Sequence, residues 1–367
     1  MQLPPLPAEP TVRTWNAMQF ARTPLPSTLL LWVVFAMMTA TATATSLSAQ
    51  QTTNPSPAAE PGQTQDKDKP GQQDSAGTFK VNVNLVNLYF VTKDKHGALV
   101  PNLAQDQFEV FEDGQPQTIK YYKADATQPL TLGLMVDTSG SEARMLPTEQ
   151  EVAGQFISTV LGEKDLAFLI SFDVNVDLLQ DLTARSQDLR AALRKTAINT
   201  GGGGGIPGLG GGPVPHAHPR GTLLYDAIYL ASEEKLKHEV GRKAMILFTD
   251  GKDEGSQTSL GQAIEAAQRA DTFVYVLLVY DPRFIKGDHE MGRLCQETGG
   301  RVIVVGTKPD KLKKALQEVS DELRSQYYIG YTPANRKADG GFRKVEIHTK
   351  TEDYRVQARK GYYAPKQ

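Results

Sequence analysis

Short, continuous apolar runs alternate with amphipathic segments along the middle of the chain, between residues 128 and 324. The apolar runs are typical of strands buried on both faces, and the amphipathic segments carry apolar residues at helical spacing, such as Val152, Phe156 and Val160. This alternation predicts an α/β fold, with a doubly wound, mostly parallel sheet and helices on both faces. We predict strands at residues 130–137, 165–173, 243–250, 273–281 and 301–306, and helices at residues 148–161, 186–198, 221–240, 259–271, 291–300 and 308–326.

The segments on either side of this block have β patterns. Residues 79–127 contain an alternating run that becomes continuously apolar, followed by a hairpin pattern around Asp113 and Gly114. Residues 325–367 return to β patterns, with Asn, Asp and Gly in the turns. We expect the two segments to form one small β-sandwich into which the α/β domain is inserted, because the entry and exit of a domain often lie close together. Two separate small β modules are the alternative.

The first 49 residues have the pattern of an export signal. Arg13 and Arg22 precede an uncharged apolar stretch, Leu29 to Met38, and small residues with Ala-x-Ala steps follow it. We interpret residues 1–49 as a signal peptide, because the apolar part is short for a membrane span of about 20 residues. A membrane anchor is the alternative. No cysteine lies directly behind the apolar run, where a lipoprotein would carry its lipid, and this excludes a lipoprotein anchor. The protein is therefore expected to be exported, to the periplasm, the cell envelope or the medium.

Two segments have compositions that do not suit a packed core. Residues 50–78 are rich in Gln, Pro, Asp, Ser and Gly, and we predict a disordered linker there. Residues 200–221 are dominated by glycine and predict a loop, which lacks the GK[ST] step of a phosphate-binding loop. His216 and His218 in this loop are more consistent with solvated side chains than with metal ligands.

Composition narrows the functional classes. The chain of 367 residues has a net charge of −2, whereas nucleic-acid-binding proteins usually show a basic excess, so we expect no nucleic-acid partner. Its single cysteine, Cys295, lies in a predicted helix and is interpreted as an inert buried thiol. No internal disulfide is possible, and export without cysteine pairs fits a bacterial envelope protein better than a eukaryotic secreted one.

Oxygen-bearing side chains follow the ends of two predicted strands. The first strand ends at Asp137, with Ser139 and Ser141 at alternating positions behind it, and the strand at residues 243–250 ends at Asp250. Thr222, preceded by a glycine, opens a predicted helix. Because ligands bind outside the carboxyl ends of the strands in open α/β sheets, we expect these five side chains to meet at one edge of the sheet.

The chemistry of this set favours a hard divalent cation. All donors are oxygens, which suit Mg²⁺, or alternatively Mn²⁺ or Ca²⁺, rather than zinc. Three of the five are neutral hydroxyls, so most of the charge of the ion would stay uncompensated. A further coordination position then suits an external carboxylate, and we predict a partner protein that presents Asp or Glu.

This set resembles the metal-ion-dependent adhesion site (MIDAS) of von Willebrand factor A (VWA) domains. The D-x-S-x-S pattern is complete at Asp137, Ser139 and Ser141, while Thr222 and Asp250 match the threonine and the second aspartate of the family. The stretches FEVFEDGQPQ and VQARKGYYAP on the two flanks are similar to bacterial VWFA-related proteins. The resemblance implies a VWA domain at residues 128–324 that binds a protein in adhesion. The glycine-rich loop before Thr222 departs from the family pattern.

Other interpretations explain less of the set. A helix N-cap accounts for one of the residues Asp137, Ser139 and Ser141 but predicts neither Thr222 nor Asp250. Ser139 stands where an aspartic protease has glycine and where an aspartyl-phosphate hydrolase has its second carboxylate, and no G-x-S-x-G elbow occurs. We therefore expect no enzymatic activity, with a hydrolase as the weakest reading. A structural envelope component, whose metal only stabilises the loops, stays open.

Overall fold

The computed structural model describes residues 85–124, 127–199, 221–279 and 288–366. The expected signal peptide or anchor at residues 1–49, the linker at 50–78 and the glycine-rich loop with His216 and His218 lie outside the described residues, apart from the last residue of the loop, Gly221. Among the described residues, no helix has the length and apolar character needed to cross a membrane.

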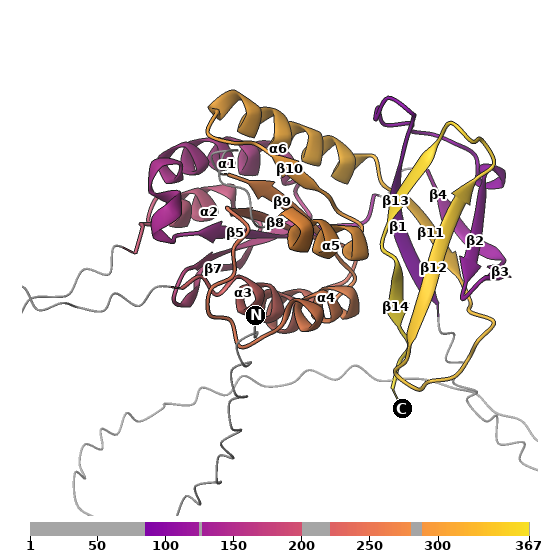
Figure 1. Ribbon diagram of the computed structural model, residues 1–367. Coiled ribbons are helices and arrows are strands. Elements are labelled where there is room, and N and C mark those ends of the chain that lie inside the picture. Colours follow the sequence, from indigo (N-terminus) through magenta and orange to yellow (C-terminus); the bar gives the residue numbers. More distant parts are fainter. Residues whose placement is uncertain (1–84, 125–126, 200–220, 280–287, 367) are drawn as a thin grey trace, which may run out of the picture. The chain divides into compact units, whose positions relative to one another are not determined.

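A six-stranded sheet with the order β10-β9-β8-β5-β6-β7 forms the centre of the α/β part (Figure 1). Five strands run parallel, and the edge strand β7 is antiparallel to β6, which confirms the mostly parallel sheet predicted from the sequence. Strand β7 was not predicted, because its residues are only half-buried and mix polar with apolar side chains. The strands are β5 (Leu130–Asp137), β6 (Leu166–Phe172), β7 (Val176–Thr183), β8 (Arg242–Thr249), β9 (Thr272–Leu278) and β10 (Val302–Val304).

Helices cover both faces of this sheet, as the alternation of the sequence predicts (Figure 1). Successive strand residues point to opposite faces, so Leu134 and Val136 pack with one group of helices and Met135 with the other. The first group is α1 (Leu146–Val160), α2 (Ser186–Leu193) and α6 (Pro309–Arg324); the second is α3 (Leu224–Leu230), α4 (Leu260–Arg269) and α5 (Asp288–Thr298). Cys295 lies buried in the second core, and burial raises the pKa of its thiol, as expected of an inert cysteine.

The helix predicted at residues 221–240 differs from the observed one. Helix α3 ends at Leu230 and continues as a π-helical turn, η3 (Ala231–Leu236), in which the backbone N–H of Lys237 donates to the carbonyl oxygen of Ser232. A regular α-helix would direct Lys235 toward the core at this point, one turn after Ala231. The extra residue of the π turn places the fully buried Leu236 there instead.

Two antiparallel four-stranded sheets contain strands from both flanks of the α/β part (Figure 1). They have the orders β13-β1-β11-β4 and β14-β12-β2-β3, and they share one hydrophobic core that includes Phe90, Phe108 and Tyr327. The strands are β1 (Val86–Lys93), β2 (Phe108–Glu112), β3 (Gln115–Gln117), β4 (Ile119–Lys123), β11 (Tyr327–Tyr331), β12 (Phe342–Thr349), β13 (Arg355–Ala358) and β14 (Gly361–Tyr363), with a short 3₁₀ turn η1 (Gln105–Gln107). The domain boundaries at 127/128 and 324/325 stay predictions.

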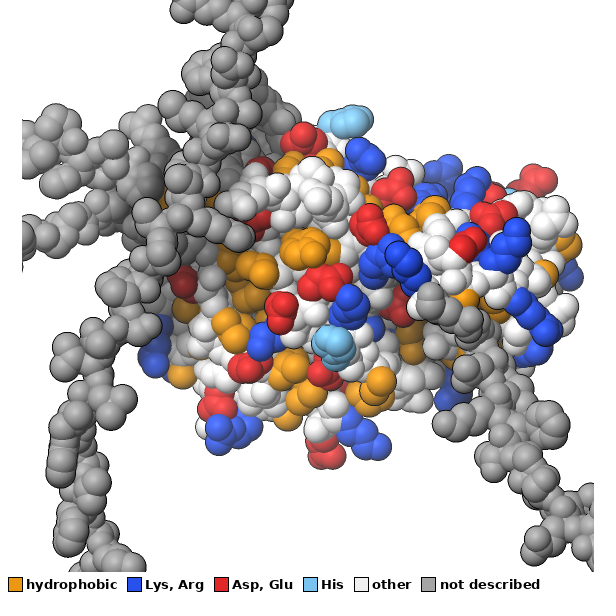
Figure 2. Space-filling model, turned by 90° about the horizontal axis from the view of Figure 1, so that it is seen from below, with side chains coloured by type: hydrophobic (Ala, Val, Ile, Leu, Met, Phe, Trp, Pro, Cys, Tyr) orange, Lys and Arg blue, Asp and Glu red, His pale blue; other side chains and the backbone are white. Residues whose placement is uncertain are grey.

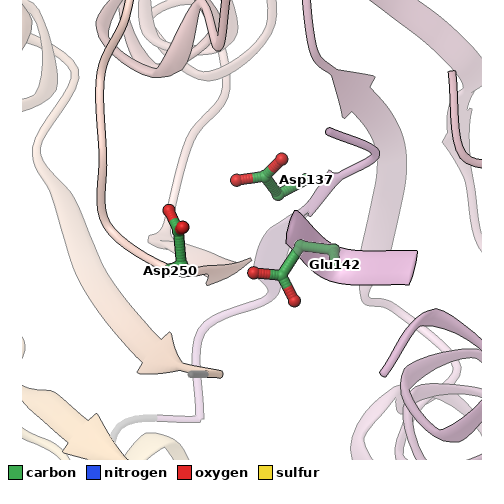
Figure 3. A group of neighbouring side chains, drawn as sticks. All are labelled: Asp137, Glu142 and Asp250. Carbon is green, nitrogen blue, oxygen red and sulfur yellow. The ribbon is translucent and has the colours of Figure 1, made fainter. Parts of the chain in front are cut away.

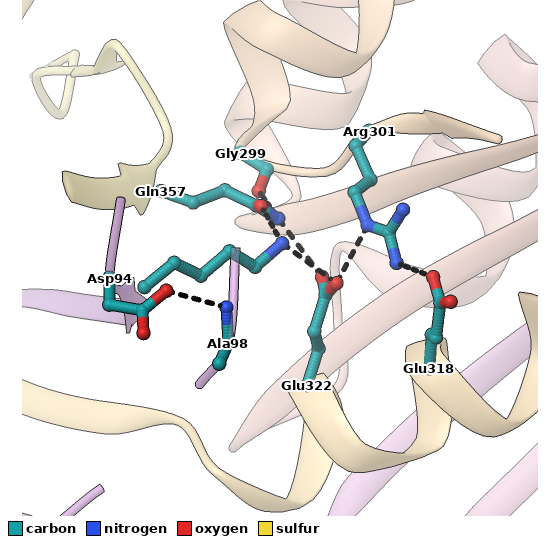
Figure 4. A network of polar contacts seen from close by, with 8 residues as sticks. Asp94, Ala98, Gly299, Arg301, Glu318, Glu322 and Gln357 are labelled. Carbon is teal, nitrogen blue, oxygen red and sulfur yellow. Dashed lines mark hydrogen bonds and ion pairs between the residues drawn. The ribbon is translucent and has the colours of Figure 1, made fainter. Parts of the chain in front are cut away.

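A polar network joins the β strands to the α/β part (Figure 4). Glu322 of α6, with a side chain only 3% exposed, accepts hydrogen bonds from Lys93 of β1 at 2.9 Å and from Arg301 at 2.7 Å. Gln357 of β13 donates to the other oxygen of Glu322 at 3.2 Å and to the carbonyl oxygen of Gly299 at 3.0 Å. One buried carboxylate therefore links residues from three distant segments of the chain.

Candidate metal centre

The candidate site lies at the carboxyl ends of β5 and β8, which are neighbours in the sheet. Their parallel register pairs Val136 with Phe248, so Asp137 lies beside Thr249 of β8. Asp250 is the residue that follows Thr249 in the chain. The hydroxyl of Thr249 donates to Oδ2 of Asp137 at 2.7 Å. The carboxylates of Asp137 and Asp250, which are 113 residues apart in the chain, are thereby brought to one edge, as the sequence predicts.

The turn after Asp137 brings the two serine hydroxyls together. The backbone N–H of Ser139 donates to Oδ1 of Asp137 at 2.9 Å, which closes the turn, and a 3₁₀ segment, η2 (Gly140–Arg144), follows. The Oγ atoms of Ser139 and Ser141 lie 3.0 Å apart. Ser139 occupies the N-cap position, but its side chain makes no capping hydrogen bond, so the N-cap interpretation does not explain its hydroxyl.

Thr222 is tied to the loop that follows Asp250. Its backbone exchanges hydrogen bonds with Glu254, at 3.3 Å and 3.0 Å, and the side chain is buried. A Cβ at Gly221 would lie 2.6 Å from the carbonyl oxygen of Glu254, so this close approach requires the glycine that precedes Thr222. The threonine is therefore anchored beside the second acidic loop, and its role as a ligand stays a prediction.

Glu142, which the sequence analysis did not single out, belongs to the same cluster, and a second such glutamate, Glu149, is buried next to it. One oxygen each of Asp137, Glu142 and Asp250 lies within 4.8 Å of the others (Figure 3). Glu142 is 1% exposed and Glu149 is fully buried, and no donor among the described residues reaches either ionised carboxylate. The two carboxyl groups can hydrogen-bond to each other when one of them is protonated. The sequence could have indicated that Glu149 is buried, because its spacing places it on the same apolar face of α1 as Val152 and Phe156. Glu142 directly follows Ser141, where nothing local distinguishes it from a surface residue.

Burial dominates the electrostatics of this cluster. Desolvation raises the pKa of Asp137 to about 6, against the opposing effect of its hydrogen bonds from Ser139 and Thr249. Desolvation and the charges of neighbouring carboxylates also raise the pKa values of Glu142 and Glu149. The ammonium of Lys252 lies 3.0 Å from Oδ2 of Asp250, and this contact raises the pKa of the Lys252 ammonium.

These side chains fit a hard divalent cation. The donors that meet here are carboxylate and hydroxyl oxygens, with no histidine or cysteine in the acidic group. A cation would also favour the ionised state of carboxylates that burial otherwise drives toward protonation. Asp137 and Asp250 are the predicted ligands whose carboxylates meet here, and the roles of Ser139, Ser141 and Thr222 as ligands stay predictions.

Solved structures similar to this chain include von Willebrand factor A domains. BatB from Bacteroides thetaiotaomicron has 17% sequence identity and a TM-score of 0.40, over 53% of this chain and 98% of that one. A von Willebrand factor type A structure from Catenulispora acidiphila has 12% identity and a TM-score of 0.44, over 78% and 75%. Proximal thread matrix protein 1 from the mussel byssus, with a zinc-occupied MIDAS motif, has 16% identity and a TM-score of 0.43, over 57% and 48%.

No protein-family model and no curated protein sequence matches the chain. With identities below 20% and TM-scores below 0.5 for the three structures, the assignment of the fold depends on the strand order and directions of the sheet itself. That topology, with D-x-S-x-S at the end of a central strand, confirms the VWA-like fold expected from the sequence.

Proposed function

We propose that this protein binds a partner protein through a divalent cation held by Asp137, Ser139, Ser141, Thr222 and Asp250. A carboxylate of the partner, from Asp or Glu, completes the coordination of the ion. The cation is Mg²⁺, with Mn²⁺ or Ca²⁺ as alternatives, because all donors are oxygens. The protein acts after export, in the periplasm, the cell envelope or the medium, with the N-terminal segment as a signal peptide or a membrane tether.

The observation that carries this proposal is the meeting of carboxylates from two strands beside a pair of serine hydroxyls. Oxygens of Asp137 and Asp250 lie within 4.8 Å of each other, a separation that one bound cation can bridge. Ser141 is exposed while Asp137 is fully buried, so the cluster runs from the interior to the surface. An ion held here is within reach of a group from outside.

The surface supports a protein partner better than a nucleic acid. Figure 2 shows one face of the molecule, on which basic and acidic side chains are interspersed and hydrophobic side chains form small groups between them. A phosphate backbone requires a continuous basic surface, which the mixed pattern on this face does not provide. The net charge of −2 points the same way.

The experiment is a binding titration with a peptide that carries one aspartate, in Mg²⁺ and again in a chelator. We expect binding in Mg²⁺ alone, and its loss in Asp137→Ala with the circular dichroism spectrum unchanged. Asp177→Ala, at an exposed aspartate on β7, is the matched control and should bind like the wild type. Full Mg²⁺ affinity in Asp137→Ala would refute the site. An equal peptide affinity in Mg²⁺ and in chelator would instead favour a metal that only stabilises the loops.

A further inference from the structure

Glu142 presents an unpaired carboxylate to the proposed cation position. Its side chain is 1% exposed, and neither Oε1 nor Oε2 has a hydrogen-bond partner among the described residues. Figure 3 shows the carboxylate of Glu142 in the same space as those of Asp137 and Asp250, and one oxygen of each lies within 4.8 Å of the others. Buried polar groups in native proteins nearly always have partners, so this one calls for an explanation.

The nearby protein groups supply no donor to the ionised carboxylate of Glu142. Glu149 lies within hydrogen-bonding reach, but two carboxyl groups can hydrogen-bond to each other only when one of them is protonated. The N–H of Ser139 and the hydroxyl of Thr249 are both directed at Asp137. The ammonium of Lys252 bonds to Asp250, and its side chain is 43% exposed. An ionised carboxylate without a partner in the protein interior is strongly unfavourable, and a metal ion is one of the two partners that buried charges have. A cation contacted by Asp137, Glu142 and Asp250 together would supply that partner and keep these carboxylates ionised.

We propose that Glu142 is a third carboxylate ligand of the divalent cation, approaching from the protein interior. This inference rests on the proposed function, because it assigns a further ligand to the same ion. Three carboxylates neutralise more of the charge of the ion than two would. The site therefore binds the ion tightly before a partner arrives. The exposed side of the ion, next to Ser141, stays open for an external carboxylate.

Glu149 is not a member of the group whose oxygens lie within 4.8 Å. It is fully buried, and its carboxyl group lies next to that of Glu142, whose pKa it raises. The chain thus places three carboxyl groups around one position, from the ends of β5 and β8 and from η2.

The test compares wild type, Glu142→Gln, Asp137→Asn and Glu151→Gln by calorimetric titration with Mg²⁺. Glu151 is an exposed glutamate on α1 and serves as the matched control. We expect Glu142→Gln to weaken Mg²⁺ binding at least about ten-fold, since even groups that only support a ligand cost 10–100-fold when they are changed. Glu151→Gln should bind like the wild type.

A second readout separates a ligand from a structural residue. In chelator, Glu142→Gln should melt at the same temperature as the wild type or higher, because the amide removes a buried carboxyl group; the stabilisation by Mg²⁺ should shrink in this variant. A melting temperature lowered equally with and without Mg²⁺ would overturn the inference. Wild-type Mg²⁺ affinity in Glu142→Gln, with binding lost in Asp137→Asn, would overturn it and leave the proposed function standing. No Mg²⁺ binding by the wild type would refute both.

Discussion

Burial of the Asp137 carboxylate makes the stability of the metal-free protein fall as the pH rises. The side chain is fully buried, and desolvation raises its pKa from 3.8 to about 6. Because the folded-state pKa lies above the unfolded value, this contribution is fully present below pH 3.8 and is lost as the pH rises through about 6. Each pKa unit corresponds to about 1.4 kcal/mol, so the total loss is roughly 3 kcal/mol, with about 2.5 kcal/mol of it between about pH 4 and 8.

The perturbation that isolates this contribution is Asp137→Asn, which removes the titrating group and keeps the size of the side chain. Urea unfolding in chelator, followed by circular dichroism, gives the free energy of unfolding of both proteins across this pH range. Glu142 and Glu149 have raised pKa values of the same sign, so they steepen the pH dependence of both proteins. The variant should therefore gain about 2.5 kcal/mol on the wild type between about pH 4 and 8.

A difference between the two proteins that stays constant over this range would refute the reasoning about burial. Asp177→Asn, at an exposed aspartate, should follow the wild type at every pH. Repeating the series in Mg²⁺ tests the cation: the wild type should recover stability at high pH, where its carboxylates are ionised, and Asp137→Asn should not. An identical gain in both proteins would mean that the ion acts elsewhere.

Three further predictions concern Lys252, Glu322 and Gly300, the last two with a control substitution. Lys252→Met should raise the Mg²⁺ affinity a few-fold in calorimetry, because the 43% exposed ammonium competes for a carboxylate 3.0 Å away; an unchanged affinity contradicts this. Glu322→Ala should lower the free energy of unfolding by about 3 kcal/mol or more, since two cations lose a buried partner. Glu318→Ala, with a 41% exposed side chain, should cost less than about 1 kcal/mol in the same urea assay, and equal losses refute the argument. Gly300→Ala should abolish soluble expression, because its Cβ would lie 1.9 Å from a backbone oxygen of β9, whereas Gly292→Ala, with no atom within 4 Å, should express normally.

The sequence determined the α/β part because its strands are local and strongly patterned. Strands such as β8 and β9 are apolar throughout, which is only stable when helices cover both faces of a sheet. The same logic predicted that Asp137 and Asp250 meet, since parallel neighbouring strands end at the same edge. Strand β7 was missed because an edge strand is half-exposed and lacks a clear period.

Tertiary structure alone decided where the other charged groups lie. Glu142 and Lys252 look like surface residues in the sequence, yet one is 1% exposed and the other bonds to a proposed ligand. The β patterns at the end of the chain are divided between two sheets, as β13 and β14 show. Such outcomes depend on which distant segments come into contact, whereas local periodicity reports only which face of an element is apolar. The sequence by itself therefore determined the fold and the acidic edge, and only packing decided how many carboxylates are buried there without a partner.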